Sequence, residues 1–196
     1  MTIRKGVSIL LAFSWVLLLT CPVVTTAQTD RFSGRTITGT IYYVGGRAAG
    51  RSQPFTLIVN RLSTNDEISQ LNNALKSGGQ DELMHVLTGL KAGRIQLGSN
   101  VGVPANAIIA TQDGDRTKLT VLFERNLRIA ELRYGTRSEN YRFGYAEMYL
   151  GRGGNEGMLI PAAQVRLNGD TWVVEDFGTF PARLMGLQVR GRGRIG

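Results

Sequence analysis

Hydrophobic and polar residues alternate with a period of two in two early segments of the chain, residues 36–44 and 55–62. Successive side chains of a strand point to opposite faces, so this period predicts two strands that each have one buried face. The segment between them, residues 45–51, is rich in glycine and carries two arginines, which is typical of a flexible, cationic turn.

The hydrophobic period then changes to that of a helix. Thr64 followed three residues later by Glu67 is the pattern of a capping box, in which each side chain satisfies an otherwise unpaired backbone N–H. Apolar residues recur at helical spacing on both sides of Gly78 and Gly79, a pair that predicts the end of one helix before a second begins. We therefore expect a helical hairpin over about residues 64–93.

Short β-type runs fill the rest of the chain. Two turn dipeptides, Asp113-Gly114 and Asn168-Gly169, supply the positive φ angles of tight hairpins, so at least two antiparallel strand pairs are expected to be local in sequence. The runs are residues 94–97, 107–111, 118–125, 127–133, 141–150, 158–167 and 171–177.

These elements indicate a mainly β (α+β) fold. The chain lacks the regular strand–helix rhythm of a parallel, doubly wound sheet. We expect an antiparallel β-barrel or sandwich of about eight or nine strands with one inserted helical hairpin, in a strand order that the sequence leaves open. Whether residues 180–189 form a final strand also stays open at this point.

The first 27 residues resemble a secretory signal peptide. Arg4 and Lys5 precede an apolar run, and a small-residue site ends at Ala27, so we expect cleavage after Ala27 and a periplasmic or secreted protein. The apolar run is too short for a retained anchor, and no membrane span is expected after cleavage. The predicted domains are thus the signal peptide 1–27, a single β-rich domain 28–189 and a flexible Arg/Gly tail 190–196.

Composition narrows the chemistry of this domain. The one cysteine, Cys21, lies in the predicted signal, so we expect neither disulfides nor thiolate metal sites in the mature chain. The one histidine, His85, falls within a predicted helix, where a catalytic triad is not expected. We therefore predict no metal site, no cofactor and no enzymatic activity.

Carboxylates on different strands are the remaining route to catalysis, since a glycosidase needs only two acids on either side of one bond. Glu175 and Asp176 are adjacent and point to opposite faces of their strand, so they do not form such a pair by themselves. A pair drawn from different strands is not visible in a sequence. The strand acids are Glu124, Glu131, Glu147, Glu175 and Asp176.

Four aromatic residues and one acid alternate onto a single strand face: Tyr141, Phe143, Tyr145, Glu147 and Tyr149. On the concave wall of a barrel this face would stack a sugar or flat ligand while the carboxylate accepts hydrogen bonds. The alternative is purely structural, because aromatic pairs also pack well across strands. Both interpretations stay open.

The net charge is +8, and no acid follows Asp176 while four arginines do: Arg183, Arg190, Arg192 and Arg194. Outside the cytoplasm the expected polyanions are lipopolysaccharide, anionic lipid and acidic glycan rather than nucleic acid. The alternative is a solvated tail without a partner.

These observations favour an exported domain of the bacterial envelope, or a secreted one, that acts as a non-enzymatic binding or structural module. One alternative is a carboxylate-dependent hydrolase of envelope glycans, which predicts an acid-lined cleft. Another is a lipocalin-like carrier of a small apolar ligand, which predicts an internal cavity. Neither the ligand nor the oligomeric state is determined by the sequence.

Overall fold

The computed structural model describes residues 30–45, 48–124, 141–169, 171–176 and 181–191. The predicted signal peptide and the predicted strand at residues 127–133 lie outside the described residues, as do Arg192 and Arg194.

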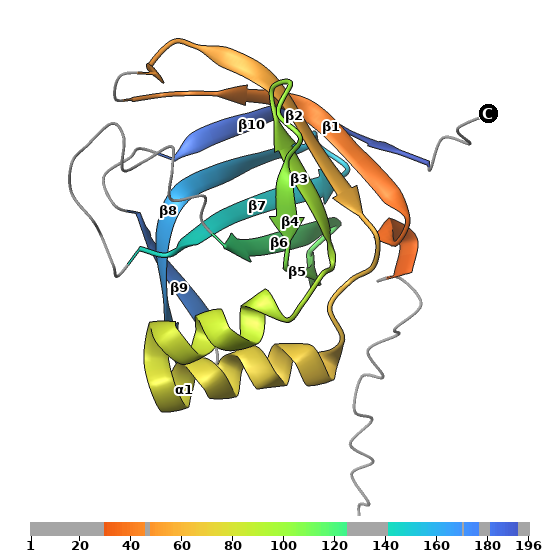
Figure 1. The fold of residues 1–196 in the computed structure, drawn as a ribbon. Coiled ribbons are helices and arrows are strands. Elements are labelled where there is room, and N and C mark those ends of the chain that lie inside the picture. The colour runs from red at the N-terminus through yellow and green to blue at the C-terminus, as the bar shows by residue number, and fades with distance from the viewer. Residues whose placement is uncertain (1–29, 46–47, 125–140, 170, 177–180, 192–196) are drawn as a thin grey trace, which may run out of the picture.

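All of the described strands are antiparallel and belong to one sheet (Figure 1). The sheet has ten strands in the order β4-β3-β2-β1-β10-β8-β7-β6-β5, and β9 pairs with the far end of β8. A short 3-10 helix, Asp30–Phe32, precedes β1. The strands are β1 (Arg35–Tyr42), β2 (Ser52–Val59), β3 (Gly93–Leu97), β4 (Val103–Ala105), β5 (Ala107–Asp113), β6 (Arg116–Glu124), β7 (Phe143–Gly151), β8 (Glu156–Asn168), β9 (Thr171–Asp176) and β10 (Ala182–Arg190).

The sheet is not closed into a barrel, which corrects one of the two architectures expected from the sequence. It curls so that β3 and β4 lie in front of β6 and β5 in Figure 1, and β4 lies close to β6. No strand pairing among the described residues joins the two ends of the order. Asn106, which follows β4 directly, accepts a hydrogen bond from the Glu124 N–H of β6 through its side chain at 3.1 Å. The strand total also exceeds the eight or nine expected.

Both predicted hairpins are present. Asp113 pairs with Arg116 across a turn at Gly114, and Asn168 pairs with Thr171 across a turn at Gly169. Both glycines have positive φ, 55° and 62°, which an L-residue adopts only with strain. The segment that the sequence left undecided forms β10, which pairs with β1 along most of its length.

The two faces of the sheet carry separate hydrophobic clusters. The inner cluster lies inside the curl and joins residues from distant strands, such as Ile37, Leu57, Leu119 and Met148. The outer cluster lies between the sheet and the helical segment and includes Leu71, Leu83, Leu122, Phe143 and Tyr145. The central strands β6, β7 and β8 therefore bury both faces along part of their length.

The helical segment, α1 (Asn65–Thr88), is one element with a break. Gly79 has φ 63° and ψ −140°, outside the helical region, and Figure 1 shows α1 folding back on itself there. The hairpin shape expected from the glycine pair is present, but no loop separates the two halves. The helical hairpin was expected to extend to about residue 93, but α1 ends at Thr88. By Ala92 the chain already bonds to the sheet, where the Ala92 N–H donates to the Ala105 carbonyl of β4 at 3.0 Å. Within the described part of the chain, no helix has the length and apolar character needed to cross a membrane.

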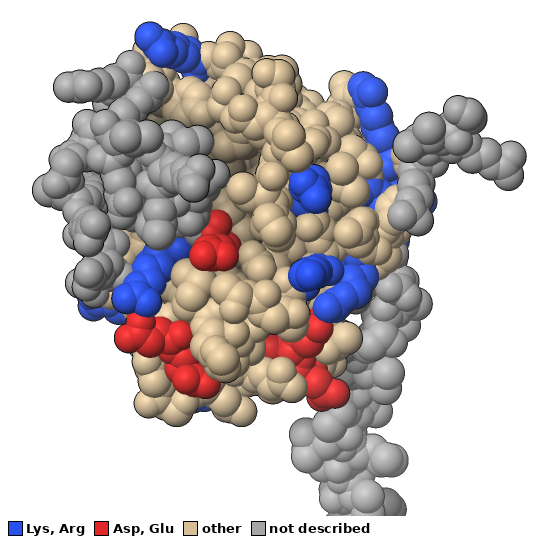
Figure 2. All heavy atoms as spheres, in the orientation of Figure 1, with Lys and Arg blue, Asp and Glu red and all other residues tan. Residues whose placement is uncertain are grey.

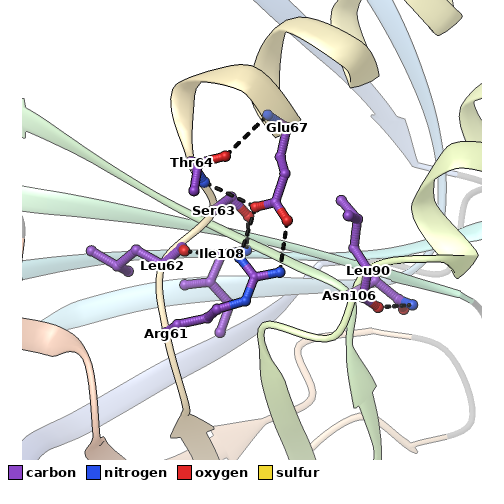
Figure 3. A network of polar contacts seen from close by, with 8 residues as sticks. All are labelled: Arg61, Leu62, Ser63, Thr64, Glu67, Leu90, Asn106 and Ile108. Carbon is purple, nitrogen blue, oxygen red and sulfur yellow. Dashed lines mark hydrogen bonds and ion pairs between the residues drawn. The ribbon is translucent and has the colours of Figure 1, made fainter.

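The start of α1 has the predicted capping box. The Glu67 N–H donates to Thr64 Oγ1 at 3.2 Å, and the Thr64 N–H donates to Glu67 Oε2 at 2.9 Å (Figure 3). Arg61 adds a two-pronged ion pair to the same carboxylate, with both N···O distances 2.7 Å. The N-terminus of α1 is thereby held at a fixed angle to the end of β2.

A second set of contacts in Figure 3 joins this corner to the sheet. Ser63 and Ile108 exchange two hydrogen bonds, of 2.8 and 3.1 Å, and the Asn106 amide donates to the Leu90 carbonyl at 3.1 Å. Asn106 is only 5% exposed. Because its side chain bonds to both β6 and the segment after α1, it ties three parts of the chain together.

Two side chains hold the rest of α1 against the far end of β8 and β9. Gln80 makes a paired amide contact with the backbone of Val165, and Trp172 Nε1 donates to Asn72 Oδ1 at 2.6 Å. The helix therefore covers one end of the outer face and leaves the other end open.

Candidate functional site

The aromatic side chains of β7 and Glu147 lie on the outer face of the sheet. The sequence analysis had placed them on the concave wall of a barrel. Their neighbours in sequence, such as Met148, point into the inner cluster, so the aromatic residues must point outward. Phe143 and Tyr145 are buried in the outer cluster. Tyr141 lies just before β7 and is partly exposed. Only Glu147 and Tyr149, further along β7, extend beyond that cluster.

Glu147 is the centre of a polar network on this face. Its carboxylate accepts hydrogen bonds from the hydroxyls of Tyr145 at 2.6 Å and Tyr149 at 2.5 Å. It also forms an ion pair with Lys118 of β6 at 2.7 Å. Glu147 is only 8% exposed, so these three donors replace most of the water that a carboxylate would otherwise bind.

The network determines the charge state of its members. Burial acts to raise the pKa of Glu147, but the hydrogen bonds from Lys118, Tyr145 and Tyr149 outweigh it, so the pKa of this carboxyl lies below its ordinary value. Burial and the adjacent carboxylate raise the pKa of Tyr145. Hydrogen bonding to Glu147 raises the pKa of Tyr149. At neutral pH the site is a carboxylate held by neutral phenols and one ammonium group.

The ring of Tyr149 is already engaged by cations. The guanidinium of Arg116 lies 4.9 Å from its centroid, and the ammonium of Lys118 lies 5.8 Å from it. Arg116 also reaches Glu156, at 3.2 Å. The stacking platform expected from the aromatic pattern is therefore largely occupied by the protein itself.

A surface groove of about 640 Å³ opens beside this network. It exists because β8 and β10 pair only through Ala182–Leu184 and then separate. Asn155 spans the gap: its side chain accepts from the Gly151 N–H and donates to the Leu187 carbonyl, both at 2.9 Å. The groove is lined by Glu147, Tyr149, Gly153, Gly154, Asn155, Glu156, Gly157, Met158, Arg183, Leu184, Met185 and Gly186.

The groove brings together residues that the sequence analysis had assigned to two separate features. Strand pairing places Glu147 opposite Met158, Met158 opposite Arg183, and Arg183 opposite Tyr42. Paired residues share a face, so the acid of the aromatic strand and the first arginine of the basic C-terminal region line one groove. Arg190, at the end of β10, is not among the lining residues.

The charges in the groove are unequally matched. Glu147 is paired with Lys118, and Glu156 is paired with Arg116. Arg183 is exposed and has no ion pair with any described residue. One positive charge is therefore left without a partner from the described chain.

The remaining candidates are dispersed. Glu124 and His85 are exposed, on β6 and α1, and Glu175 forms an ion pair with Arg166 at 3.3 Å. Glu131 lies outside the described residues. The described residues contain no group of three or more His, Cys, Asp or Glu side chains placed to hold a metal ion.

Figure 2 shows how charge is spread over one face of the molecule. Acidic side chains gather toward the end that carries α1, and basic side chains lie at several separate points, with uncharged surface between them. On this face the net positive charge does not form one continuous basic patch.

Sequence reasoning missed Lys118, which pairs with Glu147, and the groove residues Asn155, Glu156 and Met158. Nothing local marks these positions, because their proximity to Glu147 depends on the register of β6 and β8 against β7. One signal could have found Glu156. If the end of β7 and the start of β8 had been predicted to the residue, the hairpin between them would have placed Glu156 opposite Tyr149.

The chain was also compared with known proteins. No family model, curated protein or solved structure in these comparisons matches it. The function is therefore argued from the groove.

Proposed function

We propose that the protein is an exported, non-enzymatic binding module that holds an anionic group of an envelope component in the groove between β8 and β10. The observation that carries the proposal is the charge of Arg183, which has no ion-pair partner among the described residues, in a groove whose two carboxylates are both paired. The signal-like first 27 residues support a location where lipopolysaccharide, anionic lipid and acidic glycan are the available polyanions.

The lining of the groove suits an anion on chemical grounds. Arg183 offers a planar guanidinium that binds phosphate or carboxylate in a two-pronged geometry. Around it, Gly153, Gly154 and Gly186 line the groove without contributing side chains. An anionic group would thus reach Arg183 without displacing an existing ion pair.

The state of Glu147 favours binding over catalysis. A general acid must be protonated at the working pH, but the pKa of Glu147 is lowered. A general base or nucleophile needs a free oxygen, but both oxygens of Glu147 accept hydrogen bonds. Its role in this proposal is structural: it lines the groove and holds Lys118 in an ion pair.

The test is binding of the purified protein to immobilised lipopolysaccharide, measured at several salt concentrations for the wild type and two variants. Arg183→Gln is expected to weaken binding at least tenfold at low salt and to reduce its salt dependence. The matched control is Arg94→Gln, which removes the same charge from β3, several strands away. Equal binding by the wild type and Arg183→Gln would overturn the proposal.

One observation favours a second function, the hydrolysis of envelope glycans: Glu147 and Glu156 line the same groove. Glu156 lies opposite Tyr149 and therefore diagonal to Glu147 across the β7–β8 pair. Release of reducing ends from an envelope glycan by the wild type, lost in Glu156→Gln, would replace the binding proposal with this one.

A further inference from the structure

The groove continues into an exposed apolar surface, and from this we infer that its ligand is an amphiphile: an anionic phosphate head at Arg183 with one aliphatic chain beside it. This inference rests on the proposed function, since it assumes that Arg183 holds the anion. It adds the chemical class of the rest of the molecule, which the charge argument alone leaves open.

The evidence is the position of the exposed hydrophobic side chains. Six large hydrophobic residues of the described chain are exposed, and Tyr42 (42%), Val44 (52%) and Met185 (50%) are three of them. Tyr42 lies directly opposite Arg183 in the β1–β10 pairing, and Met185 is two residues along β10 on the same face. Val44 follows just after β1. The apolar exposure therefore adjoins Arg183, whose charge has no ion-pair partner among the described residues.

These residues extend the groove across three strands. Met158 of β8, Arg183 of β10 and Tyr42 of β1 form one cross-strand row. Neighbouring strands are about 4.8 Å apart, so the row spans roughly 10 Å. An aliphatic chain that starts at the guanidinium would have Met158 on one side of it, Tyr42 on the other and Met185 two residues along β10.

The side-chain types suit a flexible aliphatic partner. Methionine is unbranched and polarisable and adapts to irregular apolar surfaces. An apolar surface beside a polar site typically marks a place where a partner or ligand binds. A purely polar glycan would leave the exposed side chains of Met185 and Tyr42 in contact with polar groups, whereas an alkyl chain would remove them from water together with itself.

The other exposed hydrophobic residues provide an internal contrast. Val101 lies between β3 and β4 and is 80% exposed, far from the groove in the strand order. Val173 lies on β9. Val189 lies on β10 and lines a separate pocket of about 350 Å³ with Arg31 and Phe32. Substitutions at Val101 therefore serve as a matched control for apolar exposure in general.

The test is calorimetric titration of the purified protein with inorganic phosphate and with butyl, hexyl and octyl phosphate, all below the concentrations at which they form micelles. Full burial of a methylene strengthens binding about fourfold, so a half-buried chain on an open groove should strengthen it about twofold per added methylene. Arg183→Gln should weaken binding of every alkyl phosphate by a similar factor while keeping this dependence on chain length.

Met185→Ser should act in the opposite way: it should flatten the dependence on chain length and leave the affinity for butyl phosphate nearly unchanged. Val101→Ser should change neither. Thermal unfolding of each variant would show that the fold is retained, which we expect because both side chains are exposed.

The outcomes separate the two proposals. If all alkyl phosphates bind equally well, and binding depends on Arg183, the anion site stands and the amphiphile is overturned. If affinity rises with chain length but Met185→Ser leaves that rise intact, the chain lies elsewhere and the inference is wrong. If neither alkyl phosphates nor lipopolysaccharide bind through Arg183, the proposed function fails as well.

Discussion

Removal of the Tyr145 hydroxyl tests whether Glu147 is a buried, charged hydrogen-bond acceptor. Tyr145→Phe keeps the ring in the outer cluster and deletes one donor to the carboxylate, whose bond length is 2.6 Å. A hydrogen bond to a charged group contributes about 1.5–3 kcal/mol, against about 0.5–1.5 kcal/mol for a neutral pair. Since Tyr145 is 5% and Glu147 8% exposed, solvent screens this bond little.

The magnitude is measured most cleanly as a double-mutant cycle. In the Glu147→Gln background the acceptor is neutral, so Tyr145→Phe should cost about 1 kcal/mol less there than in the wild type. The assay is urea unfolding at pH 7, with the free energy extrapolated to water and the urea dependence compared among all four proteins. Tyr42→Phe is the control, because it removes the hydroxyl of an exposed ring.

Two results would refute this reasoning. The first is a cost below about 0.5 kcal/mol for Tyr145→Phe, which is the range of ordinary surface substitutions. The second is the same cost in both backgrounds, which would mean that the charge on Glu147 does not strengthen the bond. Either result would also remove the argument that Glu147 is fixed as a structural carboxylate.

Three further predictions concern pH, the helix break and the sheet corner. The stability difference between the wild type and Glu147→Gln should be largest above pH 4.5 and fall with acid as Glu147 protonates through its lowered pKa; at the basic end it should shrink as the pH rises past 10.5 through the raised pKa of Lys118, both measured by urea unfolding across pH. Gly79→Ala should cost about 1–3 kcal/mol, because φ 63° and ψ −140° suit glycine alone, whereas Gly89→Ala at φ −72° should cost far less in the same assay. Asn106→Ala should lower the unfolding free energy by about 2–3 kcal/mol by leaving a backbone N–H of β6 and a carbonyl after α1 unpaired; a loss below about 0.5 kcal/mol in the thermal or urea transition would show that Asn106 does not hold the corner.

Local features of the chain were predictable because their causes are local. Positive φ at Gly114 and Gly169 and the reciprocal bonds between Thr64 and Glu67 depend on residues a few positions apart. The alternation along β7 likewise determined that Tyr145, Glu147 and Tyr149 share a face, and the structure confirms it through the bonds among them. These are the parts of the site that sequence reasoning reached.

The sequence did not show which face of the sheet these residues occupy. A period of two groups residues on one face of a strand, but the pattern is the same for either face. The aromatic side chains point outward because α1 covers the outer face. There Leu71 and Leu83 of α1 pack in one cluster with Phe143 and Tyr145. That depends on the route of the chain between β2 and β3, which is tertiary information. The expected closed barrel was wrong for the same reason. Closure depends on whether the two end strands of the sheet pair, and this is also tertiary information.

The sequence by itself determined the antiparallel β class, the helical segment with its break at Gly79, two tight hairpins and the strand face that Glu147 shares with aromatic residues, all of which follow from relations between near neighbours in the chain. Only the tertiary structure decided that Arg183 lies in one groove with Glu147, because that depends on the register of β10 on β8 and of β8 on β7. Register is set by the total burial of both faces rather than by any short segment, and a shift of one residue would turn Arg183 to the opposite face.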